Sequence, residues 1–152
     1  MTKFKVFNIE FDGIDKCGKD TIMKQIFSAS PNKYIPKARG LLSQIAYNEI
    51  YHRDYEYEVT QGYLDNTLFV LLDVEEPDWK IRCDLSNEHL KNKYRVDMEG
   101  ALEYKSNCEG FEFAYSYLKD LGANIVRFNT SKLTPYEIIS RVIAIVEELN
   151  EV

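Results

Sequence analysis

The chain has 152 residues, of which 45% are hydrophobic and 29% charged, and its formal net charge is −6. This length fits one domain with a substantial core, and the composition excludes a disordered chain. The excess of acidic residues argues against a general nucleic-acid binder, and no apolar run approaches the roughly 18 residues that span a bilayer. The opening MTKFKVFNIEFDG alternates and then turns acidic, unlike a secretory signal.

The cysteines Cys17, Cys83 and Cys108 are odd in number, far apart and form no CxxC pair. This spacing is typical of reduced thiols and not of a disulfide framework or a zinc site. His52 and His89 each stand alone, so we expect no metal site of the His/Cys type. The sequence therefore predicts a cytoplasmic protein whose partners are neither membranes nor nucleic acids.

Strands and helices are expected to alternate along the chain. Apolar residues that alternate or run continuously predict buried strands, and apolar residues three and four apart predict amphipathic helices. The predicted strands cover residues 4–11, 34–38, 67–74 and 124–128. The predicted helices cover residues 19–29, 41–52 and 111–121, with another that begins after Thr134. We therefore expect an α/β layered fold with a mainly parallel sheet.

Particular residues refine these predictions. Pro36 confines its strand to a sheet edge, because proline lacks an N–H group. Residues 67–74 are apolar on both faces, which is typical of a central strand in a parallel sheet. Thr134 and Glu137 form a capping box, with Pro135 at the first helical position. The side chains expected to face the core from helix 19–29 are Ile22, Ile26 and Phe27.

A glycine-rich segment, GIDKCGKDT at residues 13–21, joins the first strand to the first helix and has the pattern GxxxxGK. Glycines let the backbone approach a polyphosphate closely, and the helix N-terminus adds a positive partial charge. Lys19 would reach the β- and γ-phosphates. The alternative is a simple glycine turn with a solvated lysine, but the flanking strand and helix favour phosphate binding.

The residue after Lys19 departs from the strict pattern, which has Ser or Thr there to hold magnesium. Asp20 could bind magnesium directly, although a carboxylate close to phosphate oxygens also repels them.

Residues 11–21 resemble the start of thymidylate kinases and related deoxynucleoside monophosphate kinases, where a strand ends in an acidic residue before GxDxxGK. Residues 38–47 resemble the family's Asp-Arg segment, residues 65–74 its penultimate core strand, and the stretch from 94 onward its closing elements. The resemblance covers most of the chain at low identity. It implies a three-layer P-loop NTPase fold, reduced in size, with residues 1–152 as one domain.

The resemblance also implies an activity and a set of roles. The family transfers the γ-phosphoryl group of ATP, with Mg²⁺, to a deoxynucleoside monophosphate such as dTMP. Arg39 would hold the acceptor phosphate, for which a planar guanidinium is well suited. Asp15 would lie beside the acceptor sugar, and the candidate magnesium ligands are Asp12 and Asp20. The residues implied at the ATP phosphates are Gly13, Asp15, Lys16, Cys17, Gly18, Lys19, Asp20 and Thr21.

A basic stretch at about 80–95 lies where the family has a mobile lid that neutralises the transferring phosphoryl group. Its cations are Lys80, Arg82, Lys91, Lys93 and Arg95, and the resemblance implies that Arg82, Lys91, Lys93 and Arg95 belong to the lid. The alternative interpretation is a solvated helix face.

The sequence departs from the family at Ala38, where the family has Asp, at Asp20, and in residues 28–37, a much shorter segment than the family's. The chain therefore resembles a minimised kinase of the kind a phage encodes, or one that has lost activity. A homodimer is left open.

Other functions remain as alternatives. A deoxynucleoside kinase would need a carboxylate base near a 5′-hydroxyl, and Asp12 is the candidate. A nucleotide-binding protein that kept the fold and lost the chemistry is the other alternative.

Single residues also have structural interpretations. Arg39 could belong to a simple turn with Gly40, and Asp73 could cap its strand instead of facing magnesium. Cys17 is expected to be partly exposed and open to alkylation. The tyrosines at 47, 51, 55, 57 and 63 could stack on a base or pack in the core.

Overall fold

The structure, a computed structural model, describes residues 5–14, 17–29, 33–89 and 98–151. Its strands form one sheet in which each pairs with its neighbours in parallel, in the order β2-β1-β3-β4. The strands are β1 (Asn8–Asp12), β2 (Ile35–Ala38), β3 (Thr67–Asp73) and β4 (Asn124–Asn129). The helices are α1 (Lys19–Ala29), α2 (Leu41–Ile50), α3 (Gln61–Asn66), α4 (Glu76–His89), α5 (Met98–Asp120) and α6 (Pro135–Asn150). The predicted α/β fold with a parallel sheet is confirmed.

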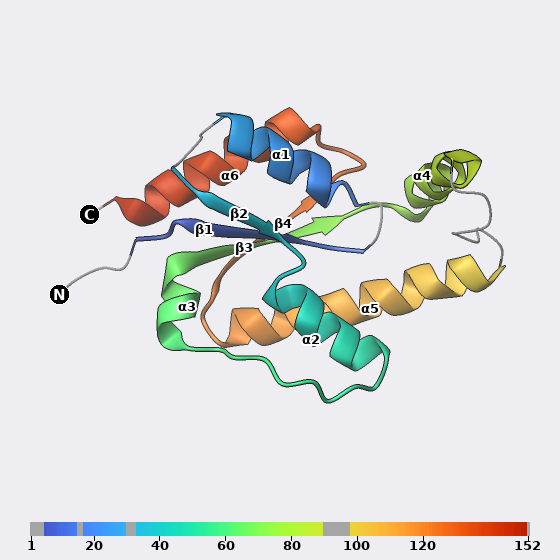
Figure 1. The fold of residues 1–152 in the computed structure, drawn as a ribbon, viewed down its shortest axis with the longest axis horizontal. Helices are drawn as coiled ribbons and strands as arrows, with labels where there is room; N and C mark the ends of the chain where they lie inside the picture. The colour runs from blue at the N-terminus through green and yellow to red at the C-terminus, as the bar shows by residue number, and fades with distance from the viewer. Residues whose placement is uncertain (1–4, 15–16, 30–32, 90–97, 152) are drawn as a thin grey trace.

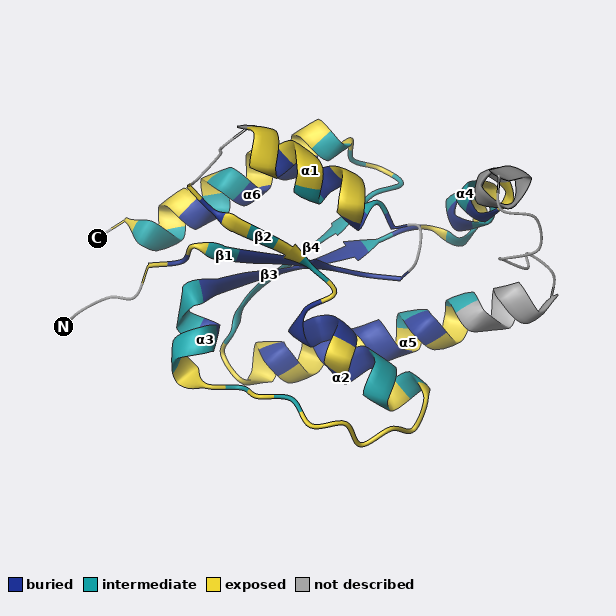
Figure 2. Cartoon of the chain, in the orientation of Figure 1, coloured by how far each residue is buried: buried dark blue, intermediate teal, exposed yellow. Residues whose placement is uncertain are grey.

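Helices cover both faces of this sheet, which gives three layers (Figure 1). Helices α1 and α6 pack together on one face, and α2 and α5 pack together on the other. Helix α4 lies beyond the carboxyl end of β3 (Figure 1). Burial is concentrated in β1 and β3 and on the inner helix faces (Figure 2). Among the described residues, no helix is both long and apolar enough to cross a membrane.

The strand predicted to be central is central. Strand β3 lies between β1 and β4, and its residues from Thr67 to Leu72 are all buried. Strand β2 lies at the sheet edge, as Pro36 predicted, and its burial alternates along the strand. The capping box is also confirmed, because Thr134 Oγ1 accepts a hydrogen bond from the Glu137 N–H (3.2 Å) and Glu137 Oε1 accepts one from the Thr134 N–H (3.2 Å).

The predicted first strand begins too early. Strand β1 starts at Asn8, and Phe4 lies outside the described residues. The side chain of Asn150 explains the late start, because it bonds both backbone groups of Val6. Asn150 Oδ1 accepts from the Val6 N–H (2.8 Å), and Asn150 Nδ2 donates to the Val6 carbonyl (3.0 Å). A side chain from α6 thus takes the place of a sheet partner.

Phe27 is 57% exposed, so the prediction that it faces the core is wrong. Ile22 and Ile26 are each 1% exposed, as expected. Phe27 follows Ile26 directly, and one residue is a rotation of about 100° around the helix. It therefore lies on the same side of α1 as Met23, toward the edge strand.

Other helices differ from their predictions. Helices α3 and α4 were not predicted, and α5 begins at Met98 instead of near residue 111. The described part of the basic stretch belongs to α4, whereas Lys91, Lys93 and Arg95 lie outside the described residues.

Candidate functional site

The predicted phosphate loop, residues 13–18, lies between the carboxyl end of β1 and the start of α1, and the structure describes its residues 13, 14, 17 and 18. Ligands of open α/β sheets bind at this edge of the sheet. Lys19 is 5% exposed, and its ammonium donates to the Gly13 carbonyl at 3.0 Å, while the Cys17 N–H donates to the Ile14 carbonyl at 3.1 Å. The Lys19 ammonium thus contacts the backbone at the start of the loop. Asp15 and Lys16 lie outside the described residues.

Both loop glycines are required by the backbone. A Cβ atom on Gly13 would collide with the Leu72 carbonyl, because β1 and β3 approach closely there. Gly18 has φ = 95°, in the left-handed region that other residues rarely adopt. The sequence predicted a phosphate loop from these same glycines.

The first turn of α1 exposes two of the predicted site residues. Asp20 and Thr21 are exposed at the helix N-terminus, where α1 begins with Lys19. A carboxylate oxygen is a ligand that Mg²⁺ accepts, so Asp20 fits a magnesium ion brought by a nucleotide. Within the described ranges, no cluster of three or more His, Cys, Asp or Glu side chains is arranged to hold a metal ion.

Cys17 is fully buried, at 0% exposure, so the expectation of a partly exposed thiol is wrong. Burial raises the pKa of the Cys17 thiol, and the nearby Lys19 charge lowers it in part. The sequence could not show this, because the turn of the loop points the side chain at residue 17 inward, close to Gly13.

Strand β1 carries two buried carboxylates on one face, Glu10 and Asp12, which are 2% and 0% exposed. Both accept hydrogen bonds from the start of α2. Asp12 Oδ1 accepts from the Gly40 N–H at 2.8 Å and from the Ser43 hydroxyl. Glu10 Oε1 accepts from the Leu41 N–H at 2.9 Å. These carboxylates cap α2, whose own N-cap residue supplies no side-chain hydrogen bond.

Asp12 also stands next to the phosphate loop. Burial raises the pKa of Asp12 to about 6, an effect that the Ser43 hydrogen bond reduces and the charge of Glu10 increases. Asp12 Oδ2 is buried and has no hydrogen-bond partner among the described residues. The magnesium roles suggested for Asp12 and Asp20 stay predictions.

Arg39 is exposed and follows the last residue of β2, Ala38, which pairs with Phe11 in β1. Because the strands are parallel, Arg39 leaves the sheet at the same edge as the phosphate loop. Its φ of 59° lies in the left-handed region, which is unfavourable for a residue with a Cβ atom. Arg39 is thus available to an anion, and its backbone is held in an uncommon conformation.

Arg82 projects from α4 and contacts the segment after β4. Its guanidinium donates to Thr130 Oγ1 at 3.2 Å and to the Thr130 carbonyl at 3.4 Å. Its charge also contributes to lowering the pKa of Cys17 in the loop. The lid role suggested for Arg82 stays a prediction.

Asp73, at the end of β3, forms an ion pair with Arg127 of β4. Arg127 Nε and Nη2 donate to its two oxygens at 2.9 and 3.0 Å, and Nη1 donates to Glu112 at 2.8 Å. These hydrogen bonds raise the pKa of Arg127. The ion pair favours the structural interpretation of Asp73.

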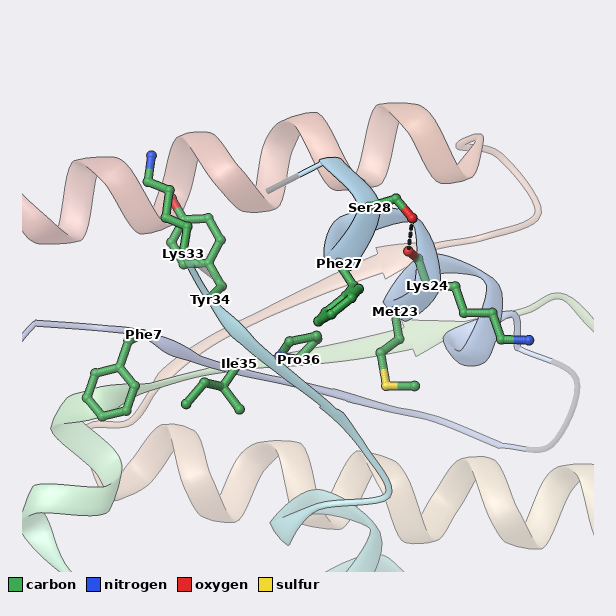
Figure 3. A pocket seen from close by; sticks show the side chains of 9 residues that line it. All are labelled: Phe7, Met23, Lys24, Phe27, Ser28, Lys33, Tyr34, Ile35 and Pro36. Atoms are coloured by element: carbon green, nitrogen blue, oxygen red, sulfur yellow. Dashed lines mark hydrogen bonds between the residues drawn. The ribbon is translucent and has the colours of Figure 1, made fainter. Parts of the chain in front are cut away.

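Two hollows lie near these elements. A cavity of about 160 Å³ opens beside Ile14 of the loop, between the end of β3 and the α5 side chains Tyr104, Cys108 and Phe111. A larger apolar groove of about 920 Å³ lies between α1 and β2, at the end of α1 remote from the phosphate loop (Figure 3). Met23, Phe27 and Pro36 line this groove (Figure 3), which explains the exposure of Phe27.

Sequence reasoning missed Glu10 and Ser43, although one signal was present. Acidic residues at positions 10 and 12 alternate with Ile9 and Phe11, so both must lie on one face of a strand that is buried. A buried carboxylate needs hydrogen-bond partners, but the sequence does not say which segment supplies them.

The three-layer α/β fold with a parallel sheet is similar to two solved structures. No protein-family model matches the chain, and no curated protein matches its sequence significantly. Among solved structures, the chain is similar to YorR protein from Bacillus subtilis, in complex with phosphorylated GDP, with a TM-score of 0.64 and 17% sequence identity. The match covers 92% of this chain and 95% of the YorR chain. The chain is also similar to thymidylate kinase from Candida albicans, with a TM-score of 0.59 and 13% sequence identity. That match covers 97% of this chain and 93% of the thymidylate kinase chain.

Proposed function

We propose that this protein is a nucleotide kinase that transfers the γ-phosphoryl group of Mg-ATP to a deoxynucleoside monophosphate. The observation that carries the proposal is the loop geometry. Lys19, Gly13 and Gly18 lie between β1 and α1, where the Lys19 ammonium contacts the Gly13 carbonyl and Gly18 has a left-handed backbone, in a fold similar to that of a thymidylate kinase.

Each part of the site has a role in this reaction. Loop amides and Lys19 hold the β- and γ-phosphates, and the N-terminus of α1 adds positive potential. Asp20 holds the magnesium ion of Mg-ATP, which neutralises phosphate charge. Arg39 binds the acceptor phosphate, and Arg82 lies where it can stabilise charge on the transferring group.

The transfer itself needs no general base. An oxygen of the acceptor phosphate is ionised at neutral pH and forms the new bond to the γ-phosphorus, while the bond to the bridging oxygen breaks and ADP leaves with that electron pair. Catalysis of this kind depends on positioning and charge stabilisation. The cavity beside Ile14 is the space we assign to part of the acceptor nucleoside.

The alternative of a deoxynucleoside kinase requires a carboxylate that reaches a 5′-hydroxyl. Asp12 has the raised pKa of such a base, about 6, but its carboxylate is buried and holds Gly40 and Ser43. The burial of Asp12 favours a phosphate acceptor over a hydroxyl acceptor.

The test is ADP production from Mg-ATP with each deoxynucleoside and ribonucleoside monophosphate in turn. We expect turnover with one acceptor or a few, and its loss in Lys19→Met, which keeps the volume of the side chain without its charge. Lys24→Met is the matched control, because Lys24 is an exposed lysine on the same helix.

Turnover with nucleosides alone would replace the proposal by the deoxynucleoside kinase. Tight nucleotide binding without turnover on any acceptor would replace it by a binding protein. That outcome would agree with two departures of the sequence from the family. Ala38 stands where the family has a carboxylate, and Asp20 stands where it has a hydroxyl residue.

A further inference from the structure

The segment that carries Arg39 is held by the two carboxylates that cap α2. Glu10 and Asp12 lie two residues apart on β1 and face the start of α2. Each accepts a backbone N–H from the residues that follow Arg39, namely Gly40 and Leu41. A carboxylate that accepts backbone amides at a helix N-terminus is stabilised by hydrogen bonds and by the helix dipole.

These contacts explain why position 40 is glycine. A Cβ atom there would overlap the Glu10 carboxylate, whose oxygens occupy that space. The same crowding fixes the path of the backbone through residues 39–41. Arg39 lies between β2, which ends at Ala38, and the two amides held by β1.

A third element, α3, contributes Tyr63 to these contacts. Its hydroxyl, on α3, donates to Glu10 Oε2, while Glu10 Oε1 accepts from Leu41. Its ring packs against Phe69 of β3 at 5.8 Å between centroids, so the hydroxyl is held in place by the core. Both oxygens of Glu10 are therefore occupied, and burial with the Glu10 hydrogen bond raises the pKa of Tyr63.

Arg39 needs such support because its conformation is strained. A left-handed backbone is unfavourable for a residue with a Cβ atom, and it persists where the surroundings enforce it. Here the guanidinium is exposed while the backbone beneath it is fixed to buried groups. A backbone fixed in this way suits a cation that must bind a phosphate at one defined position.

We propose that Glu10, Asp12, Ser43 and Tyr63 form a carboxylate clamp that fixes the backbone of Arg39 and so positions its guanidinium for the acceptor phosphate. The inference rests on the proposed function, in which Arg39 binds the acceptor. The clamp residues are positioning residues. They act through Arg39, so weakening the clamp impairs the acceptor side of the reaction and spares the ATP side.

The experiment compares Tyr63→Phe with Tyr57→Phe. Each substitution removes one hydroxyl from a partly buried tyrosine, and Tyr57 bonds Tyr117 away from the clamp. Amide hydrogen exchange at residues 40 and 41 is measured without ligand. Binding of ATP and of dTMP, dCMP, dGMP and dAMP is measured by calorimetry, and the KM values for ATP and the acceptor follow from turnover.

In Tyr63→Phe we expect exchange at residues 40 and 41 to be about tenfold faster, because a hydrogen bond to a charged group is lost. The KM for the acceptor should rise about tenfold, with the KM for ATP within about twofold of wild type. Tyr57→Phe should leave all of these values close to wild type.

Unchanged exchange at residues 40 and 41 in Tyr63→Phe would overturn the clamp. An equal weakening of ATP binding and of acceptor binding would overturn the positioning role of the clamp, because a general loss of structure affects both substrates. Failure of the wild-type protein to bind any of the four monophosphates would refute the acceptor side of the proposed function instead. The exchange comparison needs no ligand and would still decide whether the clamp holds the backbone.

Discussion

Replacing Asp12 by asparagine should change how the stability of the protein depends on pH. Asp12 is fully buried beside the phosphate loop, and burial raises its pKa from 3.8 to about 6. The hydrogen bonds from Ser43 and Gly40 and the charge of Lys19 reduce this effect, and the charge of Glu10 adds to it. The folded protein therefore holds the Asp12 proton more tightly than the unfolded chain does.

The direction in which stability changes with pH follows from this difference in proton affinity. The stability that Asp12 contributes is fully present below about pH 3, where Asp12 is protonated in both states, and is lost progressively as the pH rises from there through about 6. The difference between 3.8 and about 6 amounts to about 3 kcal/mol, because one pKa unit corresponds to about 1.36 kcal/mol. Asp12→Asn keeps a carbonyl oxygen that accepts from Gly40 and Ser43, but it does not ionise.

The assay is urea denaturation of wild type and Asp12→Asn at a series of pH values from about 3 to about 7. The free energy of unfolding of the variant, relative to wild type, should rise by about 3 kcal/mol across this range. Any difference in hydrogen bonding is independent of pH and shifts the whole curve. Parallel curves for the two proteins would refute the claim that the fold penalises the charged form of Asp12.

Other substitutions test separate parts of the structure. Arg39→Gly should be more stable than Arg39→Ala by about 1 kcal/mol in thermal denaturation, because glycine adopts the left-handed backbone freely, while both lose affinity for the acceptor; equal stabilities would contradict the observed φ. Gly40→Ala should destabilise the protein by about 1–3 kcal/mol in the same assay, because its Cβ displaces the Glu10 carboxylate, and a neutral effect would contradict that crowding. Thr134→Ala should lower the free energy of unfolding by about 1 kcal/mol, which urea denaturation would detect, and no loss would mean that the capping box is not formed. Cys17 should react slowly with iodoacetamide at neutral pH because it is buried with a raised pKa, and rapid labelling of this cysteine by mass spectrometry would show an open loop.

Much of the fold follows from short-range patterns in the sequence. Helix α1 and the start of α6 were predicted because a glycine-rich turn and a capping box mark their first residues. Strand β3 was predicted as central because it is apolar on both faces. Helix α4 was missed because residues 76–89 show little amphipathic periodicity, and α3 is too short for a pattern to be visible.

Part of the candidate site could likewise be predicted from the sequence, and part of it could not. The phosphate loop is a continuous segment, so its spacing was visible in the sequence. The contact between Tyr63 and Glu10 joins residues 53 positions apart, and the bond from Gly40 to Asp12 spans 28 positions. Such contacts depend on which helix packs on which face of the sheet, and no local pattern determines that. The same limit applies to Asp73, whose partner Arg127 comes from a strand far along the chain.

The central claim is that the site transfers a phosphoryl group to a nucleotide phosphate. The most direct measurement follows the label from [γ-³²P]ATP in the presence of Mg²⁺ and each deoxynucleoside monophosphate, for wild type and Lys19→Met. The proposed function predicts that the label appears in the matching deoxynucleoside diphosphate with wild type and that this product is lost in the variant. Label that remains in ATP with every acceptor, or a diphosphate formed equally well by Lys19→Met, would contradict it.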